Sequence, residues 1–182
     1  MPAIVSLLRG VNVGGNHLIR MEVLRALYIS LKLKNPQTLL QSGNVVFQSH
    51  EPNLAKLAAR IEDAIEKSHS FRPTVVLRTA AELRQVIAAN PFAGRPGLDP
   101  RRFLVTFLAA APAAEKIPAA LALACAPDEL HIGPRELYIY FPNGIARPTL
   151  SVPKLERILG TPGTGRNWNT VNKLMEIAGE LE

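Results

Sequence analysis

A glycine-rich loop near the start of the chain has the residue spacing of a phosphate-binding loop. In the stretch SLLRGVNVGGNHLIR, Gly10 and Gly15 enclose four residues, and such glycines let backbone N–H groups approach a phosphate. A nucleotide-hydrolysing loop of this kind also needs a lysine for the phosphates and a hydroxyl for magnesium. Asn16 and His17 occupy those positions and supply neither group. A Walker-type nucleotide hydrolase is therefore not expected.

Two interpretations of this loop remain open. In the first, the glycines only provide the backbone geometry of a strand-to-helix connection. In the second, N–H groups of the loop face an anion at the start of a helix, and an arginine adds positive charge. The candidate ligand-binding residues under the second interpretation are Arg9, Asn12, Gly14, Gly15 and His17.

His17 is the only one of the four histidines that borders a motif. Beside a bound anion, it could act as a general base on a water molecule, so a hydrolase or transferase is one hypothesis. No second histidine or acid stands at metal-ligand spacing, and the single Cys125 excludes an internal disulfide framework. We expect no metal and no cofactor, and we expect Cys125 to be a small buried apolar residue.

A second polar motif, QSGNVVF, lies between two β-prone runs and predicts a hairpin that turns at Ser42, Gly43 and Asn44. It is not the nucleophile elbow of a serine hydrolase, because no glycine stands two residues before the serine and a strand follows instead of a helix. Either these residues only form the turn, or Gln41, Ser42 and Asn44 present neutral donors and acceptors to a polar ligand.

The third motif, GRNWNTVNKLMEIA, predicts a final helix whose buried stripe begins at Trp168. Asn167 or Asn169 can cap the N-terminus of this helix. Arg166 stands just ahead of that terminus, where a guanidinium and free N–H groups together favour a phosphate or a carboxylate. We include Arg166, Asn167 and Asn169 among the candidate ligand contacts.

The net charge of +6 is concentrated in two segments that lie far apart in the sequence. Residues 1–50 hold five basic groups and one acidic group, and residues 142–173 again hold five and one. Such a distribution could form one anion-attracting face or could arise by chance. The hypotheses are therefore binding of a nucleotide or phosphorylated metabolite, nucleic-acid binding over a basic face, an enzyme using His17 or Ser42, and a protein–protein adaptor.

The apolar periodicity predicts the order βαββαβ for the first half. The expected elements are a strand at 3–8, a helix over 20–33, hairpin strands on either side of 42–44, a helix with an apolar stripe from Leu54 to Ile65, and a strand at 74–78. Thr79 with Glu82 forms a capping box that opens a further short helix, which must stop before Pro91.

The second half repeats the order β, α, β, β, α. The expected elements are a strand at 102–109, an alanine-rich helix that starts or kinks at Pro118, strands at 129–132 and 136–141, and helices near 151–159, ending at Gly160, and at 168–180. A link as short as Ser42 to Asn44 cannot make a parallel crossover. We predict an α+β fold of two ferredoxin-like (alpha-beta plait) units, 1–90 and 91–182, with an approximate boundary and with exchange of elements allowed.

The composition is that of a folded protein, with 182 residues and 47% apolar content. No apolar run approaches the roughly 20 residues that span a bilayer, and only two residues precede the first predicted strand. We expect a cytoplasmic protein with no membrane partner. The sequence does not indicate an oligomeric state.

With the motifs RGVNVGGN, QSGNVVF and GRNWNTVNKLMEIA in this order, the chain resembles the bacterial domain of unknown function 1697 family from Ile4 to about Ala178. The resemblance implies a pair of interleaved ferredoxin-like units and no established activity. In the family pattern, a lysine often follows the second loop glycine and another lies in a Ser-Lys-Leu run after the last strand. This chain has Asn16 and Thr149 at those positions.

Overall fold

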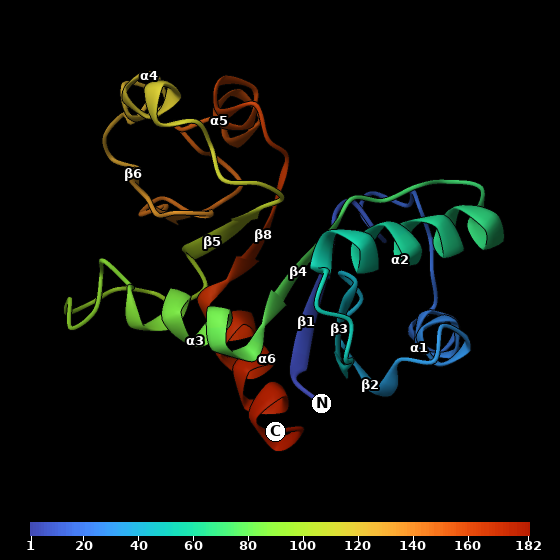
Figure 1. Cartoon of the computed structure of the whole chain (residues 1–182). Helices are drawn as coiled ribbons and strands as arrows, with labels where there is room; N and C mark the ends of the chain where they lie inside the picture. Colours follow the sequence, from blue (N-terminus) through green and yellow to red (C-terminus); the bar gives the residue numbers. More distant parts are fainter. The chain divides into compact units, whose positions relative to one another are not determined.

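The computed structural model describes residues 1–182, and the chain folds into two compact units (Figure 1). Unit 1 comprises Met1–Gln85 together with Lys173–Glu182, and unit 2 comprises Val86–Asn172. The boundary that we predicted from sequence, between residues 90 and 91, stays a prediction. None of the helices is long and apolar enough to cross a lipid bilayer.

Unit 1 is built on a four-stranded antiparallel sheet in the order β2-β3-β1-β4. Its elements are β1 (Ala3–Leu8), α1 (Met21–Ser30), β2 (Lys34–Leu39), β3 (Asn44–Gln48), α2 (Leu54–His69), β4 (Val75–Thr79), the first part of α3 (Ala80–Ala88) and the last part of α6 (Trp168–Glu180). This strand order with α1 and α2 as crossovers is the ferredoxin-like arrangement that the sequence predicts.

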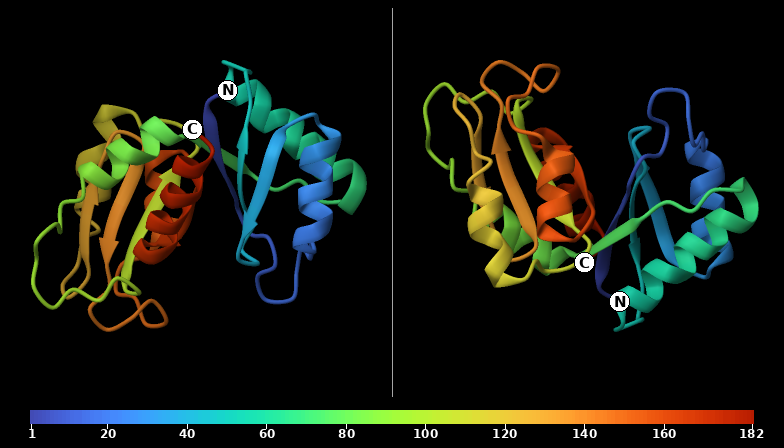
Figure 2. Two further views of the ribbon diagram at one scale, coloured as in Figure 1. Left: turned by 90° about the horizontal axis from the view of Figure 1, so that it is seen from below. Right: turned by 90° about the horizontal axis from the view of Figure 1, so that it is seen from above.

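The helices α1 and α2 cover one face of this sheet (Figure 2). The apolar stripe of α2, with Leu57, Ile61 and Ile65, is buried in the same core as strand residues such as Ile4. A buried polar contact here joins the hydroxyls of Ser6 and Tyr28 at 2.7 Å, which satisfies two buried groups at once. Burial raises the pKa of the Tyr28 phenol, so this hydroxyl stays protonated.

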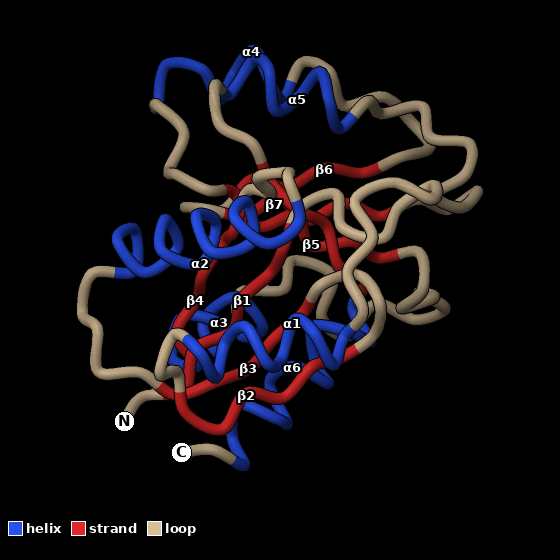
Figure 3. Tube along the Cα trace, turned by 90° about the vertical axis from the view of Figure 1, so that its right-hand side faces the viewer, coloured by secondary structure: helices blue, strands red, loops and turns tan.

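Unit 2 repeats this topology with a second four-stranded antiparallel sheet in the order β6-β7-β5-β8. Its elements are β5 (Phe103–Leu108), a short 3₁₀ turn (Ala114–Lys116), α4 (Ile117–Leu121), β6 (Glu129–Ile132), β7 (Glu136–Tyr140), α5 (Val152–Leu159), β8 (Gly163–Asn167) and the start of α6 (Trp168–Glu180). Helices α4 and α5 lie side by side over one face of this sheet (Figure 3).

The predicted fold class is confirmed, since both sheets are antiparallel and each follows the βαββαβ order. Several predicted element ends are also observed. The backbone N–H of Glu82 donates to the Thr79 hydroxyl at 3.1 Å, which is one half of the expected capping box. Pro118 lies in the first turn of α4, and Gly160 ends α5 in a left-handed conformation.

Strand β8 was not predicted, because two of its five residues are glycines. An added Cβ at Gly163 would lie 2.7 Å from the Thr106 side chain, and one at Gly165 would lie 2.8 Å from that of Leu104. The close approach of β8 to β5 therefore excludes the branched side chains by which a strand is recognised. The expected burial of Cys125 is also wrong, since this residue is exposed.

In both units, equivalent residues pair between the first strand and the last strand of the sheet. Val5 on β1 pairs with Arg78 on β4, and Val105 on β5 pairs with Arg166 on β8. Both arginines are buried, and each donates from Nη1 to the carbonyl oxygen of the residue before it, at 2.9 and 2.8 Å. The next residue caps the following helix in both units. The structural repeat thus extends to individual side chains at these positions.

Candidate functional site

The glycine loop, residues 9–20, joins β1 to α1 and is built from left-handed backbone conformations. Gly10, Asn12, Gly14, Gly15 and His17 have φ angles of 70, 55, 59, 77 and 51°. An added Cβ at any of the three glycines would meet no atom within 4 Å, so the backbone angle, and not a lack of space, favours glycine here. The loop extends beyond the end of β1 (Figure 2).

The side chain of Asn12 connects the glycine loop to the hairpin turn, residues 40–44. Its Nδ2 donates to the carbonyl oxygens of Ile19 at 2.9 Å and of Gln41 at 2.7 Å, and its Oδ1 accepts from the N–H of Ile19 at 2.8 Å. Both amide hydrogens are used within the protein. These contacts make Asn12 the residue that closes the loop, and a ligand contact by Asn12 stays a prediction.

The tip of the glycine loop presents backbone donors to solvent. Gly14 and Gly15 are exposed, and neither N–H group donates a hydrogen bond within the protein. The tight turn beneath them is closed by the N–H of Asn16, which donates to the carbonyl oxygen of Val13 at 3.1 Å. Two consecutive N–H groups in such a conformation are suited to an anion.

His17 is held beside this tip by two contacts. Its ring stacks on that of Phe71, with centroids 4.4 Å apart, and its Nδ1 lies 3.2 Å from the carbonyl oxygen of Gly10. Because a carbonyl oxygen only accepts, Nδ1 carries the proton in this contact, and Nε2 of the neutral ring has a free lone pair. The sequence did not indicate that Phe71 would position His17.

In the hairpin turn, the predicted polar residues mainly stabilise the turn itself. Asn44 is fully buried, and its Nδ2 donates to the Leu39 carbonyl oxygen at 2.8 Å and to the Ser42 hydroxyl at 3.0 Å. Gln41 is exposed and offers its carbonyl oxygen to Asn12. The observed contacts are those of turn formers, and ligand contacts by Gln41, Ser42 and Asn44 stay predictions.

We expected Arg166 to lie in a loop just ahead of the last helix, but it lies within β8 of unit 2. Its side chain is buried and donates from Nη1 to the Thr164 hydroxyl at 2.6 Å. Burial lowers the pKa of its guanidinium to about 10. Asn167 caps α6 as predicted, since its Oδ1 accepts from the N–H of Thr170 at 2.9 Å. Asn169 is exposed in the first turn of α6.

The structure therefore brings two of the three predicted motifs together in unit 1, through Asn12 and the carbonyl oxygen of Gln41. Arg9 directly follows β1, and its N–H donates to the carbonyl oxygen of Thr74 at 2.9 Å. Arg166, Asn167 and Asn169 belong to unit 2, and their meeting with the glycine loop stays a prediction.

Sequence reasoning missed the buried Arg78, although an arginine inside the apolar run VVLRT is a visible signal.

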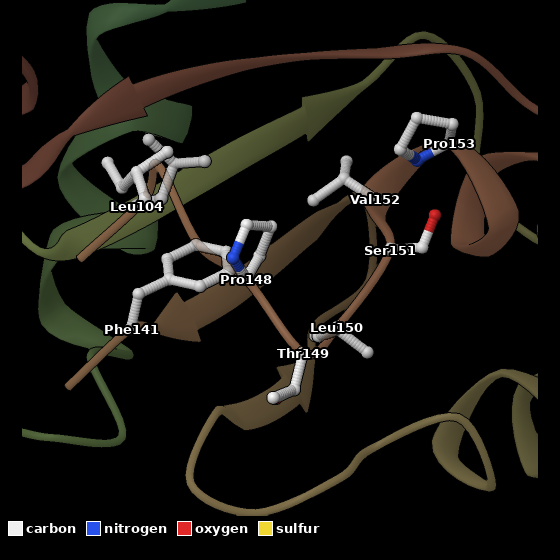
Figure 4. A pocket seen from close by; sticks show the side chains of 9 residues that line it. Leu104, Phe141, Pro148, Thr149, Leu150, Ser151, Val152 and Pro153 are labelled. Carbon is white, nitrogen blue, oxygen red and sulfur yellow. The ribbon is translucent and has the colours of Figure 1, made fainter. Parts of the chain in front are cut away.

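Unit 2 contains an apolar cavity of about 240 Å³ between β5, the end of β7 and the start of α5 (Figure 4). Its hydroxyl groups are engaged within the protein. Thr149 donates to the carbonyl oxygen of Cys125 at 3.0 Å, and Ser151 accepts from the N–H of Lys154 at 3.4 Å. No charged residue lines the cavity. This cavity is therefore unsuited to an anion.

Residues 1–138 match the family described as "Protein of unknown function (DUF1697)". The chain belongs to this family. The match includes the glycine loop and the hairpin motif but ends before GRNWNTVNKLMEIA, which also contributed to the resemblance. The family's description assigns no activity.

Among solved structures, the conserved bacterial protein SP0830 from Streptococcus pneumoniae has the same fold. The two structures superpose with a TM-score of 0.74 over 97% of this chain and 98% of the other, at 20% sequence identity. At this identity the similarity shows the fold alone. A search of curated proteins finds no match.

Proposed function

We propose that this DUF1697 protein binds an anionic small molecule, such as a nucleotide or a phosphorylated metabolite, at the glycine loop of unit 1. The observation that supports the proposal is the pair of exposed N–H groups at Gly14 and Gly15, neither of which has a partner within the protein. Backbone donors in a left-handed turn bind anions without needing a lysine. The loop can thus bind an anion although it lacks the residues of a nucleotide hydrolase.

The anchoring of the loop strengthens this proposal. Asn12 closes the loop on itself by two hydrogen bonds to Ile19 and fixes it to the hairpin turn by a third, to Gln41, and the stacked rings of His17 and Phe71 hold its second half. A loop held in its binding conformation loses little conformational entropy when a ligand binds. The first 50 residues also hold five basic groups against one acidic group, which favours anions near unit 1.

A hydrolase or transferase is the second candidate, and the position of His17 favours it. With Nδ1 directed to the Gly10 carbonyl oxygen, Nε2 is the ring atom that could accept a proton from water beside a bound anion. The His17→Asn variant should then lose turnover while it keeps ligand binding. Turnover at the wild-type rate in this variant would exclude His17 as the base.

The direct test of anion binding is a titration followed by ¹H–¹⁵N NMR on the full chain. Inorganic phosphate, pyrophosphate, AMP and acetyl phosphate are added separately. We expect at least one of them to shift the amide signals of Gly14 and Gly15 in a saturable manner. The exposed glycines Gly94 and Gly97 also have positive φ angles and open surroundings, so their amide signals serve as internal controls and should not move.

A variant pair provides the second arm. Gly14→Ala places a Cβ on a left-handed residue in the loop, and Gly97→Ala imposes the same strain outside it. A ligand at about 100 times its dissociation constant should stabilise the wild type by roughly 2.7 kcal/mol. We expect Gly14→Ala to weaken this response and Gly97→Ala to preserve it. Shifts confined to residues outside 9–20, or no shift with any probe, would contradict the proposal.

A further inference from the structure

A basic surface surrounds β2, which is an edge strand of the sheet in unit 1. Two adjoining hollows, of about 400 and 460 Å³, share Lys32, Leu33 and Lys34 as lining residues. Arg25 on α1 lines the first hollow, and Arg60 on α2 lines the second. We call the four exposed cations Arg25, Lys32, Lys34 and Arg60 the β2 surface.

Little negative charge opposes these cations. Glu51 is the only carboxylate that lines either hollow. It accepts from the N–H of Asn53 at 3.1 Å and pairs with Lys56 at 3.4 Å, so its charge is already compensated. None of the four cations of the β2 surface forms an ion pair within the protein. Glu51 also interacts electrostatically with Arg60, so it offsets part of one charge, and the β2 surface keeps an excess of positive charge.

Both arginines of the β2 surface are oriented by the backbone. Arg25 donates from Nε to the carbonyl oxygen of Pro36 at 3.0 Å, and Arg60 donates from Nη2 to that of Leu31 at 3.2 Å. Each bond uses part of a guanidinium that has five N–H groups, so several donors are left for a ligand. The guanidinium groups are thus held over the two hollows.

Protection of a sheet edge explains only part of this arrangement. A lysine and a proline within an edge strand discourage pairing with another chain, and Lys34 and Pro36 in β2 fit that role. Arg25 and Arg60 lie on helices, however, and Lys32 follows α1 in a left-handed conformation. Cations from three elements gather around two hollows, which edge protection does not require.

We propose that the β2 surface binds the phosphate backbone of single-stranded nucleic acid. All four cations are exposed, whereas sites for small molecules enclose most of the ligand. Exposed lysines and arginines spaced along a surface are typical of contacts to successive phosphates. This inference goes beyond binding at the glycine loop and does not depend on it.

The fold favours the sheet edge over the sheet face for this contact. Every residue of β1 and all but the last of β3 are buried, so the central strands offer no open face for stacked bases. Apart from His50, no aromatic side chain lines the hollows. Binding is therefore independent of base sequence. A flexible single strand can adapt its backbone to both hollows, whereas a stiff duplex keeps its own phosphate spacing.

The test measures binding of a fluorescent 12-nucleotide oligo(U) RNA by anisotropy, from 25 to 200 mM salt. Four phosphate contacts predict a slope of about −3 for log K against log salt concentration. The Lys32→Gln/Lys34→Gln variant should reduce this slope to about −1.4 and weaken binding about tenfold or more at low salt. The matched control is Lys116→Gln/Lys154→Gln, which removes the same charge from exposed positions of unit 2. It should leave the slope unchanged.

Three further probes separate the alternatives. Oligo(U) binding should be matched by oligo(dT), and an RNA duplex of the same length should bind more weakly. Equal losses in both double variants would show that only net charge matters, and this would overturn the proposal. Binding to phosphatidylserine vesicles without binding to oligo(U) would assign the β2 surface to membranes instead. If no oligonucleotide binds at 25 mM salt, the proposal is also refuted.

Discussion

The side-chain amide of Asn12 makes three hydrogen bonds to backbone groups of two segments. Removing it in Asn12→Ala leaves the partly buried N–H and carbonyl groups of Ile19 without their partner and also breaks the exposed contact to Gln41. We expect a loss of about 1–3 kcal/mol in the free energy of unfolding. Asn12→Asp should be no better, because it brings a carboxylate to two carbonyl oxygens. Urea denaturation measures both losses.

Asn16→Ala is the control for removal of an asparagine side chain from this loop, at a position without the left-handed backbone of Asn12. The Asn16 side chain only approaches the Gly14 carbonyl oxygen at 3.5 Å and is exposed, so its removal should change stability by less than about 0.5 kcal/mol. Equal effects of Asn12→Ala and Asn16→Ala would contradict a loop-closing role for Asn12. Sequence alone could not separate these two asparagines, because the difference lies in contacts between segments far apart in the chain.

At the scale of elements, the β2–β3 hairpin depends on one glycine. Gly43 has a φ of 78°, and an added Cβ would lie 2.9 Å from the Cβ of Leu8. Gly43→Ala therefore combines backbone strain with a clash in the core, and we expect a loss of about 2–4 kcal/mol. Gly10→Ala has the same backbone strain with open space around it and should lose only about 1 kcal/mol. Thermal unfolding of both variants tests the difference.

Helix α2 is tied to its surroundings by charge. Arg72 pairs with Glu62, Asp63 and Glu66, and the hydrogen bond from Arg72 lowers the pKa of Asp63 below its usual value. A carboxyl whose pKa is lower in the folded state stabilises the protein above its unfolded pKa, near 3.9, and loses this effect as the pH falls further. We expect Arg72→Gln to flatten the dependence of the urea midpoint on pH below pH 5. An unchanged profile would contradict this contribution.

The elements that could be predicted are those whose own residues determine them. The hairpin, the capping box at Thr79 and the stop at Gly160 follow from turn chemistry and caps, which act over a few residues. Strand β8 could not be predicted, because its glycines are explained only by the closeness of β5. The same holds for His17, whose orientation depends on Phe71, a residue more than fifty positions further along the chain.

At the scale of the whole molecule, the two units place equivalent residues at the end of their last strands. Each buried arginine, Arg78 or Arg166, is followed by a residue that caps the next helix. The side chains of these caps, Thr79 and Asn167, accept a hydrogen bond from the N–H group three residues further on, at 3.1 and 2.9 Å. Thr79→Ala and Asn167→Ala should each cost about 1 kcal/mol, because each removes an N-cap. Calorimetry of the two variants measures this. A loss in only one of them would show that the repeat is one of shape and not of energetics.

Unit 1 is discontinuous in the chain, since it combines Met1–Gln85 with Lys173–Glu182. Gln48 on β3 donates to the carbonyl oxygen of Leu181 at 2.6 Å, and Arg84 pairs with Glu182. During synthesis the ribosome releases residues 86–172 before residues 173–182, although domains generally fold from the N-terminal side first. The first unit to emerge is therefore the last to be completed, and on a ribosome stalled before Lys173 it would lack contacts that only translation of the final segment supplies.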